Sequence, residues 1–195
     1  MKRFRLGIII NPLAGLGGSV GLKGSDGVAL EAIAKGATPK AQMRMQQALA
    51  VILPFADNID IITASGDMGA NLCRKMGFTT TEVYCSDSTT SSDDTQHAAS
   101  CLLDQQVDLL LFAGGDGTAR DIYAVVDDRL PVLGVPAGVK IHSGVYCVSP
   151  SAAGQVVSQM IAGELVSEMD AEVRDIDENA FREGKVIAKH YGEMR

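Results

Sequence analysis

Two apolar runs, at residues 4–10 and 109–113, constrain this fold most strongly. Neither run alternates regularly between apolar and polar residues, as a strand with one solvent-exposed face would. Strands of this kind are buried on both faces, which is typical of a parallel sheet covered by helices on both sides. Further strands are expected at 59–63, 81–85 and 131–135. The sequence therefore predicts an α/β fold with a three-layer, Rossmann-like, mostly parallel sheet and flanking helices.

Helical stretches are expected between these strands. Thr38-Pro39 is a typical helix start and Gly77 a typical helix end. Asp93 and Asp94 are expected to serve as solvated caps of the helix that carries an exposed His97. The expected helices span residues 28–35, 38–54, 67–76, 119–126 and 150–162.

The C-terminal tail has a different pattern. Residues 165–176 and 186–191 look extended, and a turn at 177–184 joins them with no crossover helix. This pattern predicts an antiparallel strand pair that begins a second, β-rich domain, most of which is missing from this chain. The expected division is an α/β nucleotide-binding domain at 1–164 and a tail at 165–195.

Composition excludes several classes of protein. The chain has 24 acidic and 17 basic residues and a net charge of −7, which argues against a general nucleic-acid binder. No apolar run approaches the roughly 20 residues that span a bilayer, so no membrane association is expected. The four cysteines form no CxxC pair, which argues against zinc and disulfide frameworks. We therefore expect a cytoplasmic protein with reduced thiols.

Three glycine-containing segments follow expected strands, at residues 11–27, 114–118 and 136–144. In a parallel α/β sheet the carboxyl ends of the strands share one edge, and ligands bind beyond that edge. The sequence therefore predicts that the three segments lie together around one site.

The first of these segments could bind phosphate. Small residues leave backbone N–H groups uncovered, and consecutive N–H groups can cradle phosphate oxygens. A mobile surface loop with Lys23 in solvent explains the composition equally well, and no GK[ST] closes a Walker A loop. The candidate phosphate-binding residues are Asn11, Pro12, Ala14, Gly15, Gly17 and Gly18.

The second segment, Gly114-Gly115-Asp116-Gly117-Thr118, is more specific. Flanking glycines allow a ligand to approach the backbone, and Asp116 could accept a proton or bind a hydroxyl group. Thr118 could cap the following helix. The alternative is a tight strand-to-helix turn in which Asp116 only caps the helix.

These two segments together resemble a known superfamily. Asn11-Pro12-x-Ala14-Gly15 followed by GGDGT is similar to NAD kinases, diacylglycerol and sphingosine kinases, and phosphofructokinases. The longer runs GGDGTARD and PAGVKIHSG resemble the NAD kinase-like branch that includes the acetoin-catabolism X protein. The resemblance covers the chain from about residue 5 to its end.

The resemblance implies roles for the motif residues. Asp116 would contact the adenosine ribose and act as base for its 2′-hydroxyl, and Gly114, Gly115, Gly117 and Thr118 would line the nucleotide site. ATP would be the phosphoryl donor with Mg²⁺ carried on its triphosphate, NAD is a candidate substrate, and no protein-bound metal is implied. Arg120 could reach a phosphate, or it could pair with a neighbouring side chain.

The third segment would border the substrate site by the same resemblance. Its candidate substrate contacts are Gly138, Lys140, His142 and Ser143. Each polar residue in this set is also an ordinary loop residue, so both interpretations stay open.

The sequence departs from the superfamily at two places. Ala119-Arg120-Asp121 stands where lipid kinases have an Asn-Glu pair, which disfavours a lipid substrate. The later Asn-Glu motif of NAD kinases is absent, and Glu178-Asn179 has the reverse order.

The first hypothesis is an ATP-dependent kinase of NAD or a related nucleotide, seen here as its N-terminal domain and inactive alone. The alternatives are a non-catalytic nucleotide-sensing module and, more weakly, a lipid kinase. An apolar surface at 166–191 would favour a homo-oligomer.

Overall fold

A computed structural model describes most of the chain. The described residues are 3–12, 40–86, 91–137, 146–147, 149–163, 171–176 and 188–194, the last two ranges by their backbone alone. The helix expected at 28–35 lies outside these residues.

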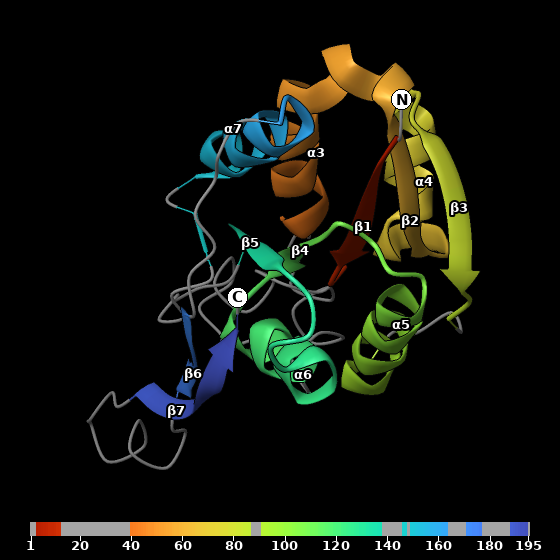
Figure 1. The fold of residues 1–195 in the computed structure, drawn as a ribbon. Coiled ribbons are helices and arrows are strands. Elements are labelled where there is room, and N and C mark those ends of the chain that lie inside the picture. The colour runs from red at the N-terminus through yellow and green to blue at the C-terminus, as the bar shows by residue number, and fades with distance from the viewer. Residues whose placement is uncertain are drawn as a thin grey trace.

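Five parallel strands form the central sheet in the order β3-β2-β1-β4-β5 (Figure 1). Strands β1 and β4 occupy its middle and pair from Leu6↔Leu109 to Ile10↔Ala113. Every strand pair in this sheet is parallel, so the predicted α/β fold is confirmed. The strands are β1 (Phe4–Ile10), β2 (Ile59–Ala64), β3 (Thr79–Tyr84), β4 (Leu109–Gly114) and β5 (Val132–Pro136).

Helices cover both faces of the sheet, which gives three layers (Figure 1). One face packs against α3 (Ala41–Ile52), α4 (Ala70–Met76) and α7 (Pro150–Ile161). The opposite face packs against α5 (Ser92–Asp104) and α6 (Asp116–Val126). Two short 3-10 helices, η1 (Leu53–Asn58) and η2 (Gly66–Met68), flank β2.

Strand β1 shows why its sequence does not alternate. Ile8 and Ile10 belong to the core on the α3 face, whereas Ile9 belongs to the core on the α6 face, and all three are fully buried. Successive side chains of a strand point to opposite faces, so a strand covered on both sides needs apolar residues at consecutive positions. The near-continuous apolar run is thus explained by burial on both faces.

The ends of two helices follow their local sequence. Gly77 ends α4 with φ +96°, a left-handed conformation that favours glycine. At the start of α5, Ser91 and Asp94 form a reciprocal capping box, and His97 is exposed on that helix. The capping role expected for Asp94 is therefore confirmed.

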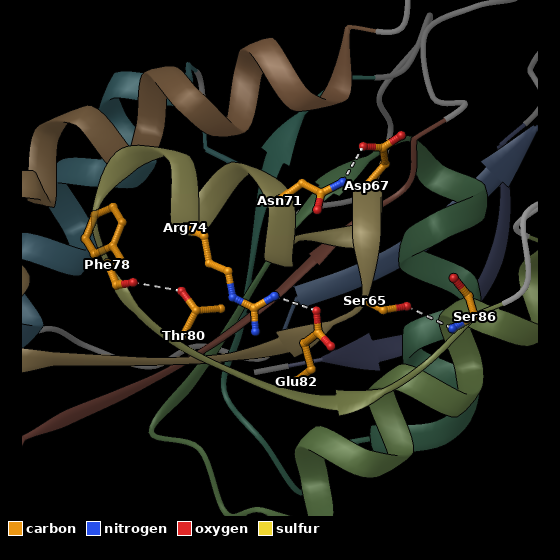
Figure 2. A network of polar contacts seen from close by, with 8 residues as sticks. All are labelled: Ser65, Asp67, Asn71, Arg74, Phe78, Thr80, Glu82 and Ser86. Carbon is orange, nitrogen blue, oxygen red and sulfur yellow. Dashed lines mark hydrogen bonds and ion pairs between the residues drawn. The ribbon is translucent and has the colours of Figure 1, made fainter.

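Polar contacts tie the outer part of the sheet together (Figure 2). Arg74 on α4 reaches Glu82 on β3 at 2.7 Å. The Ser86 backbone N–H donates to the Ser65 hydroxyl at 3.0 Å, which joins the segments that leave β2 and β3. These contacts fix the α4–β3 edge, away from the middle strands.

The tail forms a separate two-stranded sheet. Strands β6 (Ala171–Ile176) and β7 (Ala188–Met194) pair antiparallel with each other. Figure 1 places them beside α6, on the side away from α3. None of the described helices has the length and hydrophobicity to cross a bilayer.

Candidate functional site

The chain leaves the two middle strands in opposite directions across the sheet. After β1 it continues toward β2 and β3, and after β4 it continues toward β5. In open parallel sheets this reversal leaves a crevice at the carboxyl ends of the two strands, where ligands bind. Asn11 follows β1 and Gly115 follows β4, so both glycine-containing segments begin at this position.

The GGDGT motif forms the transition from β4 into α6. Gly115 is the N-cap and Asp116 is the first residue of α6. The helix was expected to begin at Ala119, with Thr118 and Asp116 as alternative caps. The helix begins earlier, because Asp116, Gly117 and Thr118 already belong to its first turn and the N-cap is Gly115. Asp116 thus belongs to the first turn of a helix, where negative charge is favoured.

Asp116 is buried at this position, with 4% of its surface exposed. Gly115 and Gly117, on either side of it, are half-buried. Burying a carboxylate costs free energy unless polar partners replace the lost water. Buried aspartates are therefore uncommon, and Asp116 is a stronger candidate for a functional residue than an exposed aspartate.

Three successive backbone carbonyls around the motif are bonded to three different segments. The Ala113 carbonyl accepts from the Asn11 N–H at 2.9 Å, and the Gly114 carbonyl accepts from the Ala137 N–H at 3.2 Å. The Gly115 carbonyl accepts from the Tyr146 hydroxyl. The structure thereby brings together the starts of the first two glycine-containing segments and both flanks of the third.

A side-chain contact joins the first two segments directly. The Asn11 side-chain amide donates to the Thr118 hydroxyl at 3.0 Å. Asn11 and Pro12 are half-buried, and so is Arg120, two residues after Thr118 on α6. The expectation that the segments after β1 and β4 share one edge is confirmed for the described residues.

Close packing explains one glycine of the motif. A Cβ on Gly114 would lie 2.4 Å from Thr118 Oγ1 and 2.6 Å from Thr118 Cβ. No side chain fits there, because the first turn of α6 folds back over the end of β4. The glycine at 114 is therefore required by contact within the protein, whatever ligand binds nearby.

Several predicted site residues lie outside the described part of the chain. They are Ala14, Gly15, Gly17, Gly18, Lys23, Gly138, Lys140, His142 and Ser143.

Sequence reasoning missed Ala137 and Tyr146 as partners of the motif. The signal that could have found Tyr146 is Gly134, an isolated glycine inside β5, because such a glycine often marks a close approach. A Cβ on Gly134 would lie 2.6 Å from Tyr146 Cδ1.

Within the residues that the structure describes, no group of three or more His, Cys, Asp or Glu side chains could hold a metal ion. The site contains the buried Asp116, a helix start and backbone groups. A helix start and uncovered backbone N–H groups suit an anionic ligand such as a phosphate.

Comparison with known proteins agrees with this arrangement. The family model described as ATP-NAD kinase N-terminal domain matches residues 6–165, a span that includes β1 from Leu6 onward, the other four strands of the central sheet and the whole GGDGT motif. A search of curated protein sequences found no match. On the strength of the family match over most of its length, the chain belongs to the ATP-NAD kinase N-terminal domain family.

Proposed function

We propose that this chain is the nucleotide-binding domain of an ATP-dependent kinase that phosphorylates a hydroxyl group of NAD or a related nucleotide. The observation that carries the proposal is the hydrogen-bonded junction of Asn11 with the Asp116 turn at the middle of the sheet. This is where a parallel α/β sheet binds ligands, and the family implies ATP and NAD.

Asp116 has the central role in the proposal. Its carboxylate binds the ribose hydroxyl and accepts the proton as the hydroxyl oxygen forms its bond to the transferred phosphoryl group. The bond from that phosphorus to the leaving oxygen of ADP breaks in the same transfer. Phosphoryl transfer depends chiefly on positioning and on neutralising charge, so one well-placed carboxylate is sufficient protein chemistry for the acceptor side.

The segment that begins at Asn11 is proposed to bind phosphates, with Gly115 and Gly117 leaving room for the nucleotide. Arg120 is proposed as a further phosphate contact from α6. Mg²⁺ is proposed to arrive on the ATP triphosphate, where it would neutralise charge.

Two finer assignments belong to the same proposal. The runs GGDGTARD and PAGVKIHSG favour the acetoin-catabolism X branch of the family. The antiparallel pairing of β6 and β7, in a sheet separate from the parallel one, favours residues 165–195 as the first strands of a second domain.

Calorimetric titration of the 195-residue chain with ATP–Mg²⁺, NAD and NADH tests the proposal. We expect at least one nucleotide to bind, and Asp116→Asn to weaken its binding about tenfold or more, because hydrogen bonds to a charged group are the stronger ones. Asp104→Asn is the matched control, since Asp104 is an exposed aspartate at the far end of α5. The proposal is wrong if none of the three ligands binds, or if both substitutions have the same effect.

Transfer of phosphate from ATP to NAD, measured in the full-length protein that carries this domain, separates a kinase from a nucleotide sensor. A kinase produces NADP, and Asp116→Asn abolishes that product while Asp104→Asn does not. A sensing module binds the nucleotide and forms no product in any variant.

A further inference from the structure

We propose that Tyr146 is a positioning residue, which holds the peptide in front of Asp116 in the orientation that nucleotide binding requires. The inference rests on the proposed function, because it assigns Tyr146 to the same site. Neither the GGDGT motif nor the segment after β1 includes this residue, and it lies 31 positions beyond its partner in the chain.

The contact is made to the peptide group that leads into Asp116. The Tyr146 hydroxyl donates to the Gly115 carbonyl, and the Ala119 N–H donates to the same oxygen at 3.1 Å. A peptide group is planar, so fixing the Gly115 carbonyl also fixes the direction of the Asp116 N–H. Tyr146 therefore controls where one backbone donor of the helix start points.

The motif needs such an external support because of its own composition. Gly114, Gly115 and Gly117 surround Asp116, and glycine restricts the backbone less than any other residue. Within α6, the Gly115 oxygen accepts one hydrogen bond, from the Ala119 N–H. A second donor from outside the helix defines the orientation of the peptide.

The tyrosine ring is itself held in place. It lies directly on Gly134 of β5, where a Cβ would come within 2.6 Å of its Cδ1 atom. Its edge-to-face contact with Phe112 has a centroid distance of 5.3 Å and an interplanar angle of 68°. The Cys147 N–H donates to the Gly134 carbonyl at 3.1 Å and fixes the backbone beside the ring. The hydroxyl therefore reaches Gly115 from a rigid support.

Tyr146→Phe tests the inference, because it removes the hydroxyl and keeps the ring. Tyr123→Phe is the matched control, since Tyr123 is also half-buried and packs against the same core on the α6 face. We expect Tyr146→Phe to weaken binding of the nucleotide about five- to tenfold in calorimetry, the loss typical of one hydrogen bond. Tyr123→Phe should change the affinity less than about twofold.

A double-mutant cycle with Asp116→Asn separates an effect on the peptide from an effect on the carboxylate. Asp116→Asn keeps the backbone N–H that Tyr146 orients, so Tyr146→Phe should weaken binding by the same five- to tenfold on that background, and a loss below about twofold there would contradict the backbone role. Hydrogen exchange gives an independent readout: without ligand, the amides of residues 116–119 should exchange several-fold faster in Tyr146→Phe than in Tyr123→Phe.

Gly134→Ala provides a second variant, which keeps the hydroxyl and displaces the ring that carries it. The same loss of affinity is expected. If the unmodified chain binds nucleotide and both Tyr146→Phe and Gly134→Ala bind it equally well, Tyr146 has no positioning role and the proposed function stands. If the unmodified chain binds no nucleotide, the proposed function fails and this inference fails with it.

Discussion

The side-chain amide of Asn11 donates a hydrogen bond to the Thr118 hydroxyl at 3.0 Å, across 107 residues of sequence. It connects the residue after β1 to the first turn of α6. The contact joins the two segments that the sequence singled out for phosphate binding and for hydroxyl binding.

This contact predicts an energetic coupling between the two residues. Asn11→Ala, Thr118→Val and the double variant, compared by urea unfolding, should give a coupling of about 0.5–1.5 kcal/mol, the usual worth of a neutral hydrogen bond in a folded protein. The exposed pair Asn71 on α4 and Asp67 on η2, joined at 3.2 Å, is the control. Its coupling should stay below about 0.5 kcal/mol. Equal values for the two pairs would contradict a structural role for the Asn11 contact.

Gly114→Ala should destabilise the protein by about 1–3 kcal/mol, because its Cβ has no room beside Thr118. Gly7→Ala is the control: its Cβ would lie 3.1 Å from Val107 Cγ2, a side-chain atom that can shift. That substitution should cost about 1 kcal/mol or less. Thermal unfolding measures the stability of the two variants. A Gly114→Ala protein as stable as wild type would show that the end of β4 has room for a Cβ.

The thiols should differ sharply in reactivity. Burial raises the pKa of Cys73 to about 12, and the charge of Arg74 only partly opposes this. The thiolate is the reactive form, so Cys73 should resist a maleimide at pH 8 while the exposed Cys85 is modified. Peptide mass mapping in buffer and in urea measures this difference. Comparable labelling of Cys73 and Cys85 in the folded protein would be inconsistent with the buried position of Cys73.

The capping box of α5 should contribute a pH-dependent stability. Partial burial raises the pKa of Asp94, but hydrogen bonds from the Tyr84 hydroxyl and from Ser91, with the charge of His97, outweigh it and lower the pKa below its usual value. A carboxylate whose pKa is lower in the folded state stabilises the fold above its unfolded pKa of about 3.9, and this stability is lost as the pH falls through the folded value.

Asp94→Ala should therefore cost about 1 kcal/mol at pH 6, with the difference from wild type shrinking below pH 4. Asp93→Ala is the control, because Asp93 is an exposed neighbour in the same first turn. Urea unfolding at pH 6 and pH 3 measures both variants. A cost for Asp94→Ala that is the same at both pH values would argue against a charged cap.

The parallel sheet could be predicted because burial on both faces leaves a direct trace in sequence, the apolar runs of β1 and β4. The start of α6 could not be predicted, because Gly115 and Gly117 are poor helix formers and the sequence of the turn resembles a loop. The contacts made there come from Asn11 and Tyr146, which bond to Thr118 and Gly115 and are distant from them in sequence. Asp116 was predicted as a site residue from its local motif, and that role stays a prediction. Tyr146 was missed because its contact with Gly115 spans 31 residues, and the isolated Gly134 marks a close approach without naming the residue that approaches.

The carbonyls of Ala113, Gly114 and Gly115 receive their donors from residues 11, 137 and 146, so the earliest and later parts of the chain must all be present before this edge is complete. Closing such long loops is slow compared with forming a local helix. A ribosome-bound chain that has emerged only as far as β4 would already contain Asn11 and the strand before Asp116, but not the donors at Ala137 and Tyr146. Nucleotide capture would then be among the last properties acquired during folding, and a binding assay would report on how completely the domain has matured.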